Sequence, residues 1–413
     1  MSIFLTDRRL DQDYNNLTLI KDKIMSDFRE KVLNLHKKNI GKLDILPNVN
    51  LDTRADLSLA YTPGVAIACE EIAKDKTKAY LYTMKGKTVA IVTDGSAVLG
   101  LGKIGPEAAL PVMEGKSALL YKFSKIQAMP ICLDTYDEEE IIKTVKYLAP
   151  NFSAIMLEDI QAPKCVYIEN TLQRELDIPV FHDDQHGTAI VVSAALLNAL
   201  KVIDKPLNEV KIVVSGSGAA GSAIIKLLNI LGAKEIYNYN LLGVVKESKY
   251  NQYDVVVKDL IDRNLVKTDE SINSLAELMI GKDVFIGVSA RNILSKAMVE
   301  SMSKDNIVFA LANPEPEISY ALAKEARARI IGTGRSDFPN QINNVLVFPG
   351  LMKGALKARA RSITDEMKVI ACKALQSLVP DELLNEENIL PGIFDERVVE
   401  TIAEAIYKEA KKG

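Results

Sequence analysis

The sequence predicts an α/β fold made of two consecutive units that each contain a parallel sheet. Three observations support this prediction. Short, nearly continuous apolar runs alternate with stretches of helical periodicity, as expected for strands that are covered by helices on both faces. Pro206 and Asn208 interrupt the chain between two such series. The 413 residues suffice for two or three domains of about 100–200 residues each.

The first series begins with a predicted amphipathic helix and continues as strands and helices in turn. Within residues 1–40, apolar side chains recur three and four residues apart, at Leu17, Ile20, Ile24, Phe28, Val32 and Leu35. The predicted strands are Thr88–Thr93, Ala128–Leu133, Phe152–Leu157 and Ile178–Phe181. The predicted helices are Pro106–Phe123, Asp137–Leu148 and Thr188–Leu200.

The second series contains one prominent helix, Ala219–Leu231, and then more strands. The predicted strands are Lys211–Ser215, Glu235–Tyr239, Asp283–Val288, Asn306–Ala312 and Arg329–Thr333. After Phe348-Pro349-Gly350 the chain is rich in alanine and lysine, which predicts helices with a break near Val379–Pro391. We predict two domains, residues 1–178 and residues 179–413.

Composition excludes several classes of protein. The chain is 48% apolar and 26% charged, as in ordinary soluble proteins. Its formal net charge is −4, and it contains no cluster of basic residues of the kind that binds nucleic acid. The longest apolar stretch, Ala189–Leu200, is shorter than the roughly 20 residues that cross a membrane. The charged N-terminus does not look like a signal peptide. Four scattered cysteines without a C-x-x-C pair predict reduced thiols in a cytoplasmic protein.

A glycine-rich turn indicates a nucleotide site. Gly216-Ser217-Gly218-Ala219-Ala220-Gly221 follows a predicted strand and opens a predicted helix, which is the context that the G-x-G-x-x-G pattern requires. The first glycine allows the tight turn, the second lets the backbone approach a pyrophosphate, and the third allows close helix–strand packing. We expect Gly216, Gly218, Ala219, Ala220 and Gly221 to bind a dinucleotide such as NAD or NADP in a Rossmann-type domain.

The residue that usually selects between these two coenzymes is replaced. An acid about 20 residues after the turn normally binds the adenine ribose, whereas Asn240 occupies that position here. An amide can bind a ribose hydroxyl without repelling a 2′-phosphate, and Lys246 and Lys249 follow nearby. Each lysine taken singly is better interpreted as solvated surface, so the sequence permits NADP and does not exclude NAD.

Two acidic doublets precede the glycine turn. Glu158-Asp159 ends one predicted strand, and Asp183-Asp184 follows another. Carboxylates gathered at strand ends are ligands for hard cations such as Mg²⁺ and Mn²⁺, and three of the four would form a suitable site. One doublet alone would be better explained as a helix cap, but two in one sheet favour metal. His182 and His186 flank the second doublet and are better suited to hydrogen bonding than to ligation.

Two other residues are ambiguous from physical arguments alone. Tyr61 lies in a turn fixed by Pro63 and Gly64, and Lys116 lies within a predicted helix. A packed ring and a solvated lysine are the favoured interpretations on that basis.

The chain resembles the malic enzymes, in particular the short bacterial form, over roughly residues 25–400. The resemblance is carried in order by Ser58–Ala66 (SLAYTPGVA), Val92–Gly105 (VTDGSAVLGLGKIG), Leu110–Lys116 (LPVMEGK), Glu158-Asp159, Phe181–Ala189 (FHDDQHGTA), Gly216–Gly221, Asn313–Ile318 (NPEPEI) and Asn343–Gly350 (NNVLVFPG). It implies an oxidoreductase acting on a CH–OH group, which converts L-malate to pyruvate and CO₂ with NAD or NADP and with Mg²⁺ or Mn²⁺. A homodimer or a dimer of dimers is also implied.

The resemblance assigns roles to individual positions. Glu158, Asp159 and Asp184 resemble the metal ligands. Lys116 resembles the general base, Asp183 its partner, and Tyr61 the acid that protonates C3 of the enol product. Asn313 and Asn344 resemble amides that hold the substrate carboxylate, and Asn313 also borders the coenzyme.

The chain departs from the family pattern at the Asp-Gly turn. Larger malic enzymes carry a substrate-binding arginine there, whereas Asp94-Gly95 is followed by Ser96-Ala97-Val98. We expect Ser96, backbone N–H groups, or Asn313 and Asn344 to hold the substrate carboxylate instead. Lys103 stands where the family often has asparagine or aspartate.

Three alternative functions remain open at this stage. One is a metal-dependent oxaloacetate decarboxylase on the same scaffold, which the intact glycine turn argues against. Another is an amino-acid dehydrogenase, which would need no metal. The third is a nucleotide-binding sensor without catalysis, which the retained catalytic groups make a poor explanation.

Overall fold

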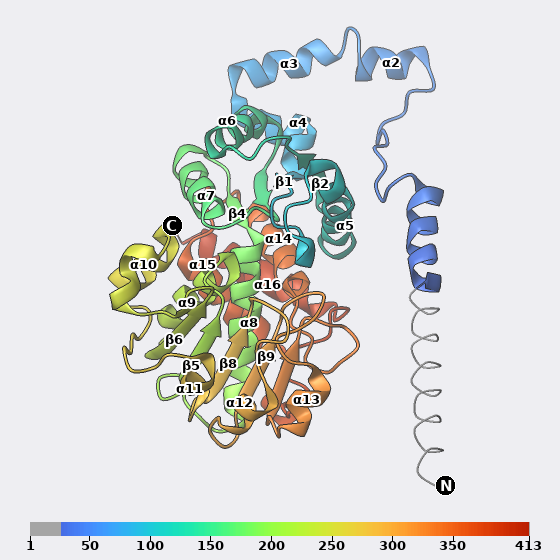
Figure 1. Ribbon diagram of the computed structural model, residues 1–413. Coiled ribbons are helices and arrows are strands. Elements are labelled where there is room, and N and C mark those ends of the chain that lie inside the picture. Colours follow the sequence, from blue (N-terminus) through green and yellow to red (C-terminus); the bar gives the residue numbers. More distant parts are fainter. Residues whose placement is uncertain (1–25, 413) are drawn as a thin grey trace. The chain divides into compact units, whose positions relative to one another are not determined.

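The computed structural model describes residues 26–412. Residues 26–39 form a helix in a first unit, Met1–Asn48, which is separate from the second unit, Val49–Gly413. The helix predicted for residues 1–40 is thus confirmed in its second part, while Leu17, Ile20 and Ile24 lie outside the described residues. Both sheets belong to the second unit (Figure 1). Within residues 26–412, no helix combines the length and the apolar character needed to cross a membrane.

The first sheet has four parallel strands in the order β2-β1-β3-β4. They are β1 (Thr88–Thr93), β2 (Gln127–Cys132), β3 (Ala154–Leu157) and β4 (Val180–His182). Its crossover helices are α5 (Pro106–Ser124), α6 (Glu138–Leu148) and α7 (Lys164–Glu175). All four strands were predicted within two residues at each end. Helix α7 was not predicted, because polar Glu169 and Thr171 interrupt its buried face.

Three short helices precede this sheet and bury none of their residues. They are α2 (Arg54–Ala60), α3 (Val65–Lys74) and α4 (Ala79–Tyr82). Several of their side chains are nevertheless large and apolar, including the exposed Leu57, Leu59 and Ile67. This segment therefore presents apolar surface that residues 26–412 leave exposed.

The second sheet has six strands in the order β10-β9-β8-β5-β6-β7, parallel except for the β6–β7 pair. They are β5 (Lys211–Ser215), β6 (Glu235–Asn240), β7 (Gly243–Val244), β8 (Val284–Gly287), β9 (Ile307–Ala310) and β10 (Ile330–Thr333). The helices between them are α9 (Ala219–Leu231), α10 (Val255–Asp262), α11 (Leu275–Met279), α12 (Lys296–Glu300) and α13 (Tyr320–Glu325). This is the doubly wound arrangement that the sequence predicted.

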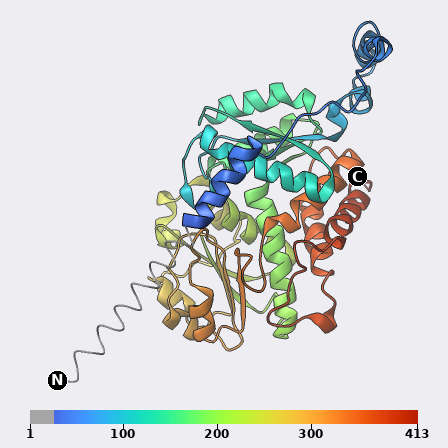
Figure 2. The same ribbon diagram turned by 90° about the vertical axis from the view of Figure 1, so that its right-hand side faces the viewer.

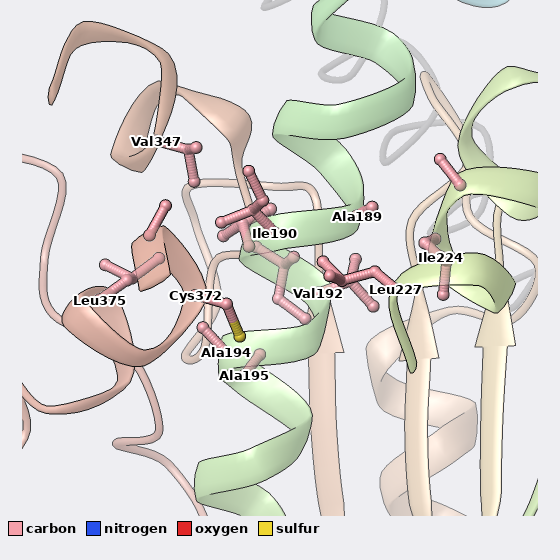
Figure 3. Close-up of a cluster of buried hydrophobic side chains, with 14 of the residues drawn as sticks. Ala189, Ile190, Val192, Ala194, Ala195, Ile224, Leu227, Val347, Cys372 and Leu375 are labelled. Atoms are coloured by element: carbon pink, nitrogen blue, oxygen red, sulfur yellow. The ribbon is translucent and has the colours of Figure 1, made fainter. Parts of the chain in front are cut away.

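Helix α8 (Asp183–Val202) follows the last strand of the first sheet and leads to the second. Its middle part, from Ala189 to Leu200, is mostly apolar and mostly buried. Ile190 and Val192 belong to one core cluster with Leu227 of α9 and Leu375 (Figure 3). Of the C-terminal helices α14 (Phe348–Ala358), α15 (Asp365–Gln376) and α16 (Arg397–Ala410), α15 packs against α8, and α16 packs against both α14 and α15 (these helices are orange to red in Figure 2). The predicted break between these helices is confirmed at residues 377–396.

The observed α8 begins at Asp183, five residues before the predicted start at Thr188. The second acidic doublet thus forms the first turn of a helix, where negative charge is favoured by the helix dipole. The predicted domain boundary after residue 178 falls just before β4, which pairs with β3 in the first sheet.

Both sheets have a topological switch point, where successive connections leave in opposite directions. In the first sheet the chain passes from β1 to β2 on one side and returns to β3 on the other. In the second sheet β5 is flanked by β6 and β8 in the same way. Ligands of open α/β sheets bind at the carboxyl ends of strands at such points, so the loops after β1, β3 and β5 are the expected site.

Candidate active site

Three carboxylates meet at the carboxyl ends of β3 and β4. Glu158, Asp159 and Asp184 each offer an oxygen, and these oxygens lie within 4.8 Å of one another. The backbone N–H of Asp159 donates to Asp184 Oδ2 at 2.7 Å, which ties the two doublets together. Asp159 adopts a left-handed backbone with φ of 53°, a conformation that aspartate tolerates better than most residues. The structure therefore brings together the three acids predicted as metal ligands.

Lys116 reaches this cluster from α5. Its Nζ lies 2.6 Å from Asp183 Oδ2 and 2.8 Å from Glu158 Oε1, and the Phe348 ring lies 4.6 Å away. Lys116 is buried, contrary to the solvated position that its sequence context alone favours. The pairing with Asp183 agrees with the roles expected from the resemblance.

The carboxylates of Glu158, Asp159, Asp183 and Asp184 gather around the ammonium group of Lys116. Although burial opposes a charged lysine, the carboxylates of Asp183, Glu158 and Asp184 raise the pKa of Lys116 above its ordinary value. Burial raises the pKa of Glu158 well above its usual range and raises that of Asp183 as well, against the attraction of Lys116. Within the described residues, buried Glu158 Oε2 has no hydrogen-bond partner. An all-oxygen donor set with excess negative charge fits a hard divalent cation.

The Asp183 carboxylate rests directly on Gly187, one turn later in α8. A Cβ placed on Gly187 would lie 1.9 Å from Asp183 Oδ1 and 3.2 Å from Cβ of Asn344. Asn344 begins a short 3-10 helix, Asn344–Leu346, that leads into α14. The structure thus places predicted Asn344 beside the Lys116–Asp183 pair.

The glycine-rich loop after β1 contacts the loop after β9. A Cβ on Gly100 would lie 2.2 Å from the carbonyl oxygen of Asn313 and 2.5 Å from Pro314 Cδ, so only glycine fits this approach. Predicted Asn313 is exposed beside that contact. The loop after β1 in the first sheet and the loop after β9 in the second sheet therefore meet at Gly100 and Asn313.

Ser96 is buried in the loop after β1, but its hydroxyl is already engaged. It donates to Asp94 Oδ1 at 2.6 Å and accepts the backbone N–H of Gln161 at 2.9 Å. Asp94 also forms an ion pair with Lys164 of α7. In this arrangement Ser96 has no free proton for a substrate carboxylate, and its predicted substrate role stays a prediction.

The glycine turn after β5 has the geometry of a phosphate site. Gly216 has φ of 114°, and a Cβ on Gly221 would lie 2.0 Å from the Gly216 carbonyl oxygen. Gly218 begins α9 without a side-chain cap, so the N–H groups of Ala219 and Ala220 at the helix start suit a phosphate. Sequence reasoning missed Asn238, which donates to Gly216 O at 3.0 Å and fixes the turn from within β6.

The two lysines considered for coenzyme selection, Lys246 and Lys249, have different surroundings beyond β6. Asn240 Oδ1 accepts the backbone N–H of Leu242 at 2.8 Å. Lys246 is buried and donates to Glu270 O and Asn273 Oδ1, away from that turn. Lys249 donates to Leu242 O at 2.6 Å, and Leu242 is the residue whose N–H bonds to Asn240. Of the two lysines, Lys249 is therefore the one that bonds to the turn containing Asn240.

Tyr61 stands apart from this group. It follows α2, its side chain is 71% exposed, and its hydroxyl forms no hydrogen bond with any residue between 26 and 412. The structure does not bring Tyr61 together with Lys116. The predicted acid role of Tyr61 therefore stays a prediction.

Comparisons with known proteins point to one family. Residues 40–141 match the family described as "Malic enzyme, N-terminal domain", and residues 185–411 match "Malic enzyme, NAD binding domain". The chain is 51% identical to the "Bifunctional malic/malolactic enzyme" of Bacillus subtilis, over 92% of this chain and 93% of that protein. It is 43% identical to the "NADP-dependent malic enzyme" of Escherichia coli, over 93% of this chain and 52% of that protein.

A solved structure agrees with these matches. The malic enzyme of Pyrococcus horikoshii superposes with a TM-score of 0.87 at 46% identity, covering 93% of this chain and 91% of the other. Similar sequence and similar structure thus extend over both sheets and the site between them.

Proposed function

Because this chain belongs to the malic enzyme family, we propose that it oxidises and decarboxylates L-malate to pyruvate and CO₂ while reducing NAD⁺ or NADP⁺. The observation that carries the proposal is the position of Lys116. A buried lysine bonded to Asp183 and Glu158, beside a three-carboxylate cluster, combines a proton acceptor with a cation site. An amino-acid dehydrogenase would not need that cluster, and a nucleotide sensor would not need the buried lysine.

Two groups would complete the site. Glu158, Asp159 and Asp184 would hold Mg²⁺ or Mn²⁺, which supplies Lewis-acid polarisation of malate and offsets the negative charge that raises the pKa of Lys116. The turn from Gly216 to Gly221 would hold the coenzyme, whose nicotinamide accepts the hydride. Asn313 and Asn344 would orient the substrate carboxylate from the second domain.

The side chains divide the proton transfers between them. Lys116 takes the proton from the C2 hydroxyl of malate, and Asp183 orients the ammonium group through the bond at 2.6 Å. After loss of CO₂, a proton must reach C3 of the enol. We assign that step to Tyr61, the acid that the family resemblance implies, because its phenol O–H can donate a proton.

The direct test is nicotinamide reduction by L-malate with Mn²⁺, run with NAD⁺ and NADP⁺ side by side and repeated with EDTA. We expect reduction that depends on malate and disappears with EDTA. Reduction that survives EDTA would rule out the role given to the acid doublets. Absence of reduction, together with CO₂ release from oxaloacetate, would favour the decarboxylase instead.

The coenzyme choice is tested by Asn240→Asp. The aspartate can keep the bond to the Leu242 N–H, so the turn is preserved while a negative charge is added. We expect a tenfold or larger shift of kcat/KM toward NAD⁺, since about 1.4 kcal/mol of repulsion from a 2′-phosphate suffices. Asn251→Asp, at an exposed position of the next loop, is the control. An unchanged ratio in Asn240→Asp would show that this position does not face the 2′ position.

We further propose that the protein is cytoplasmic and forms a homodimer or a dimer of dimers. The apolar side chains of α2 and α3, among them Leu57, Leu59 and Ile67, are exposed in the single chain and would be covered by association. All four cysteines are free, which suits a reducing compartment.

A further inference from the structure

A buried carboxylate on α7 holds the second acidic doublet from both sides. Glu169 is only 2% exposed. Its Oε1 accepts the backbone N–H of His182, the residue before the doublet, at 2.9 Å. Its Oε2 accepts from Gln185 Nε2 and His186 Nε2, which follow the doublet, both at 2.9 Å. A carboxylate can only accept here, so His186 carries its proton on Nε2.

The surroundings keep this carboxylate charged. Burial alone would raise the pKa of Glu169, but His186, His182 and Lys368 together lower it below its ordinary value. Within the described residues, no lysine or arginine lies within ion-pair distance of Glu169, and its only ionisable hydrogen-bond partner is His186. The charge sits at the N-terminus of α8, which has no cap from the His182 side chain, and the helix dipole favours an anion there.

A buried acid is a costly way to join two helices. Apolar residues of similar volume would hold α7 against α8 without the desolvation penalty of a carboxylate. Glu169 accepts four hydrogen bonds from the described residues, one of them from Gln173 on α7 itself. The other three come from His182, Gln185 and His186, which lie within five consecutive residues at the start of α8. Between the held residues lie Asp183, which bonds Lys116, and Asp184, which accepts the N–H of Asp159.

We infer that Glu169 is a positioning residue that fixes the turn between β4 and α8, so that Asp183 meets Lys116 and Asp184 completes the three-carboxylate cluster. Glu169 itself does not contact the cluster and acts through the backbone of His182 and the side chains of Gln185 and His186. The inference rests on the proposed function, because the cluster must bind a divalent cation. Groups that orient metal ligands in this way typically contribute 10–100-fold to metal affinity.

The experiment measures Mn²⁺ binding directly, by the free-Mn²⁺ EPR signal, on the full chain carrying Glu169→Gln. The amide keeps the shape but loses the charge and one acceptor. We expect Mn²⁺ affinity to fall 10–100-fold, NAD⁺ or NADP⁺ binding to stay unchanged, and saturating Mn²⁺ to restore part of kcat. Glu175→Gln is the matched control, because Glu175 lies on the same helix but forms only a surface ion pair with Lys146. Its Mn²⁺ affinity should equal that of the wild type.

The outcomes separate this inference from the proposed function. If wild-type protein binds no Mn²⁺, the proposed metal site fails, and the inference fails with it. If wild type binds Mn²⁺ and Glu169→Gln binds it equally well while unfolding at a lower temperature, Glu169 is merely structural and the inference alone is overturned. Should Glu169→Gln fail to fold, Gln185→Met removes one of the three bonds at constant length. A smaller loss of Mn²⁺ affinity supports the inference, and an unchanged affinity overturns it.

Discussion

Replacement of Lys116 by alanine should lower malate-dependent kcat by about 10²–10⁴-fold, the range that a general base contributes. No other described lysine is bonded to Asp183 or Glu158, so no neighbour can take over the proton. Coenzyme binding should persist, because the glycine turn after β5 belongs to the other sheet. Steady-state kinetics and coenzyme titration measure the two effects separately. Lys122→Ala, at an exposed position of the same helix, should retain full activity.

Folding of the Lys116→Ala variant provides a second measurement. Loss of one partner from a buried ion pair costs about 3–5 kcal/mol, because the remaining charges are left uncompensated. The pKa values of Glu158 and Asp183 are already raised in the folded state. At pH values above the ordinary pKa of a carboxyl group, the folded state therefore binds more protons than the unfolded state. Stability then falls as pH rises, and it should fall more steeply without Lys116. Thermal unfolding of the wild type and of the variant at pH 5 and pH 8 tests this expectation. In the kinetic experiment, near-normal turnover of Lys116→Ala would show that Lys116 is not the general base.

Strands β1 and β3 were predictable because they are buried on both faces. In β1 and β3 every residue is buried, so the apolar run in the sequence marks the strand almost to its ends. Helix α7 was missed because its buried face contains the polar residues Glu169 and Thr171. A helix that buries polar residues loses the periodicity on which prediction depends.

The three candidate metal ligands were predictable from the sequence, but the residues that position the site were not. The acids at strand ends converge because parallel strands place their carboxyl ends on one edge, which the sequence pattern already implies. Lys116 could be assigned only through the family resemblance, since its burial depends on how α5 packs. The positioning roles of Asn238 and Glu169 carry no local signal, because the bonds that Glu169 accepts from the β4–α8 turn and the bonds that Asn238 makes to the glycine turn join residues 13 to 24 positions apart.

Position 187 shows how closely the catalytic pair is packed. Alanine is favoured over glycine inside a helix by about 1 kcal/mol, so Gly187→Ala would be stabilising on propensity alone. The same methyl group would lie 1.9 Å from Asp183 Oδ1 and 2.9 Å from Asp183 Cγ. Asp183 is fully buried and bonded to Lys116, so it has little room to move. Overpacking costs of about 1–3 kcal/mol should therefore outweigh the gain in propensity.

Gly187→Ala should accordingly lower both stability and turnover, the latter by about 10²-fold if Asp183 moves by 1 Å from Lys116. Gly115→Ala is a matched control, since Gly115 also lies inside a helix, next to Lys116, but a Cβ there meets no atom within 4 Å. That variant should keep its activity and gain stability by up to about 1 kcal/mol. Thermal unfolding and kcat of both variants test the argument. If Gly187→Ala and Gly115→Ala had the same unfolding temperature and the same kcat, Asp183 could accommodate the methyl group without moving away from Lys116. The close packing at Gly187 would then have no catalytic consequence.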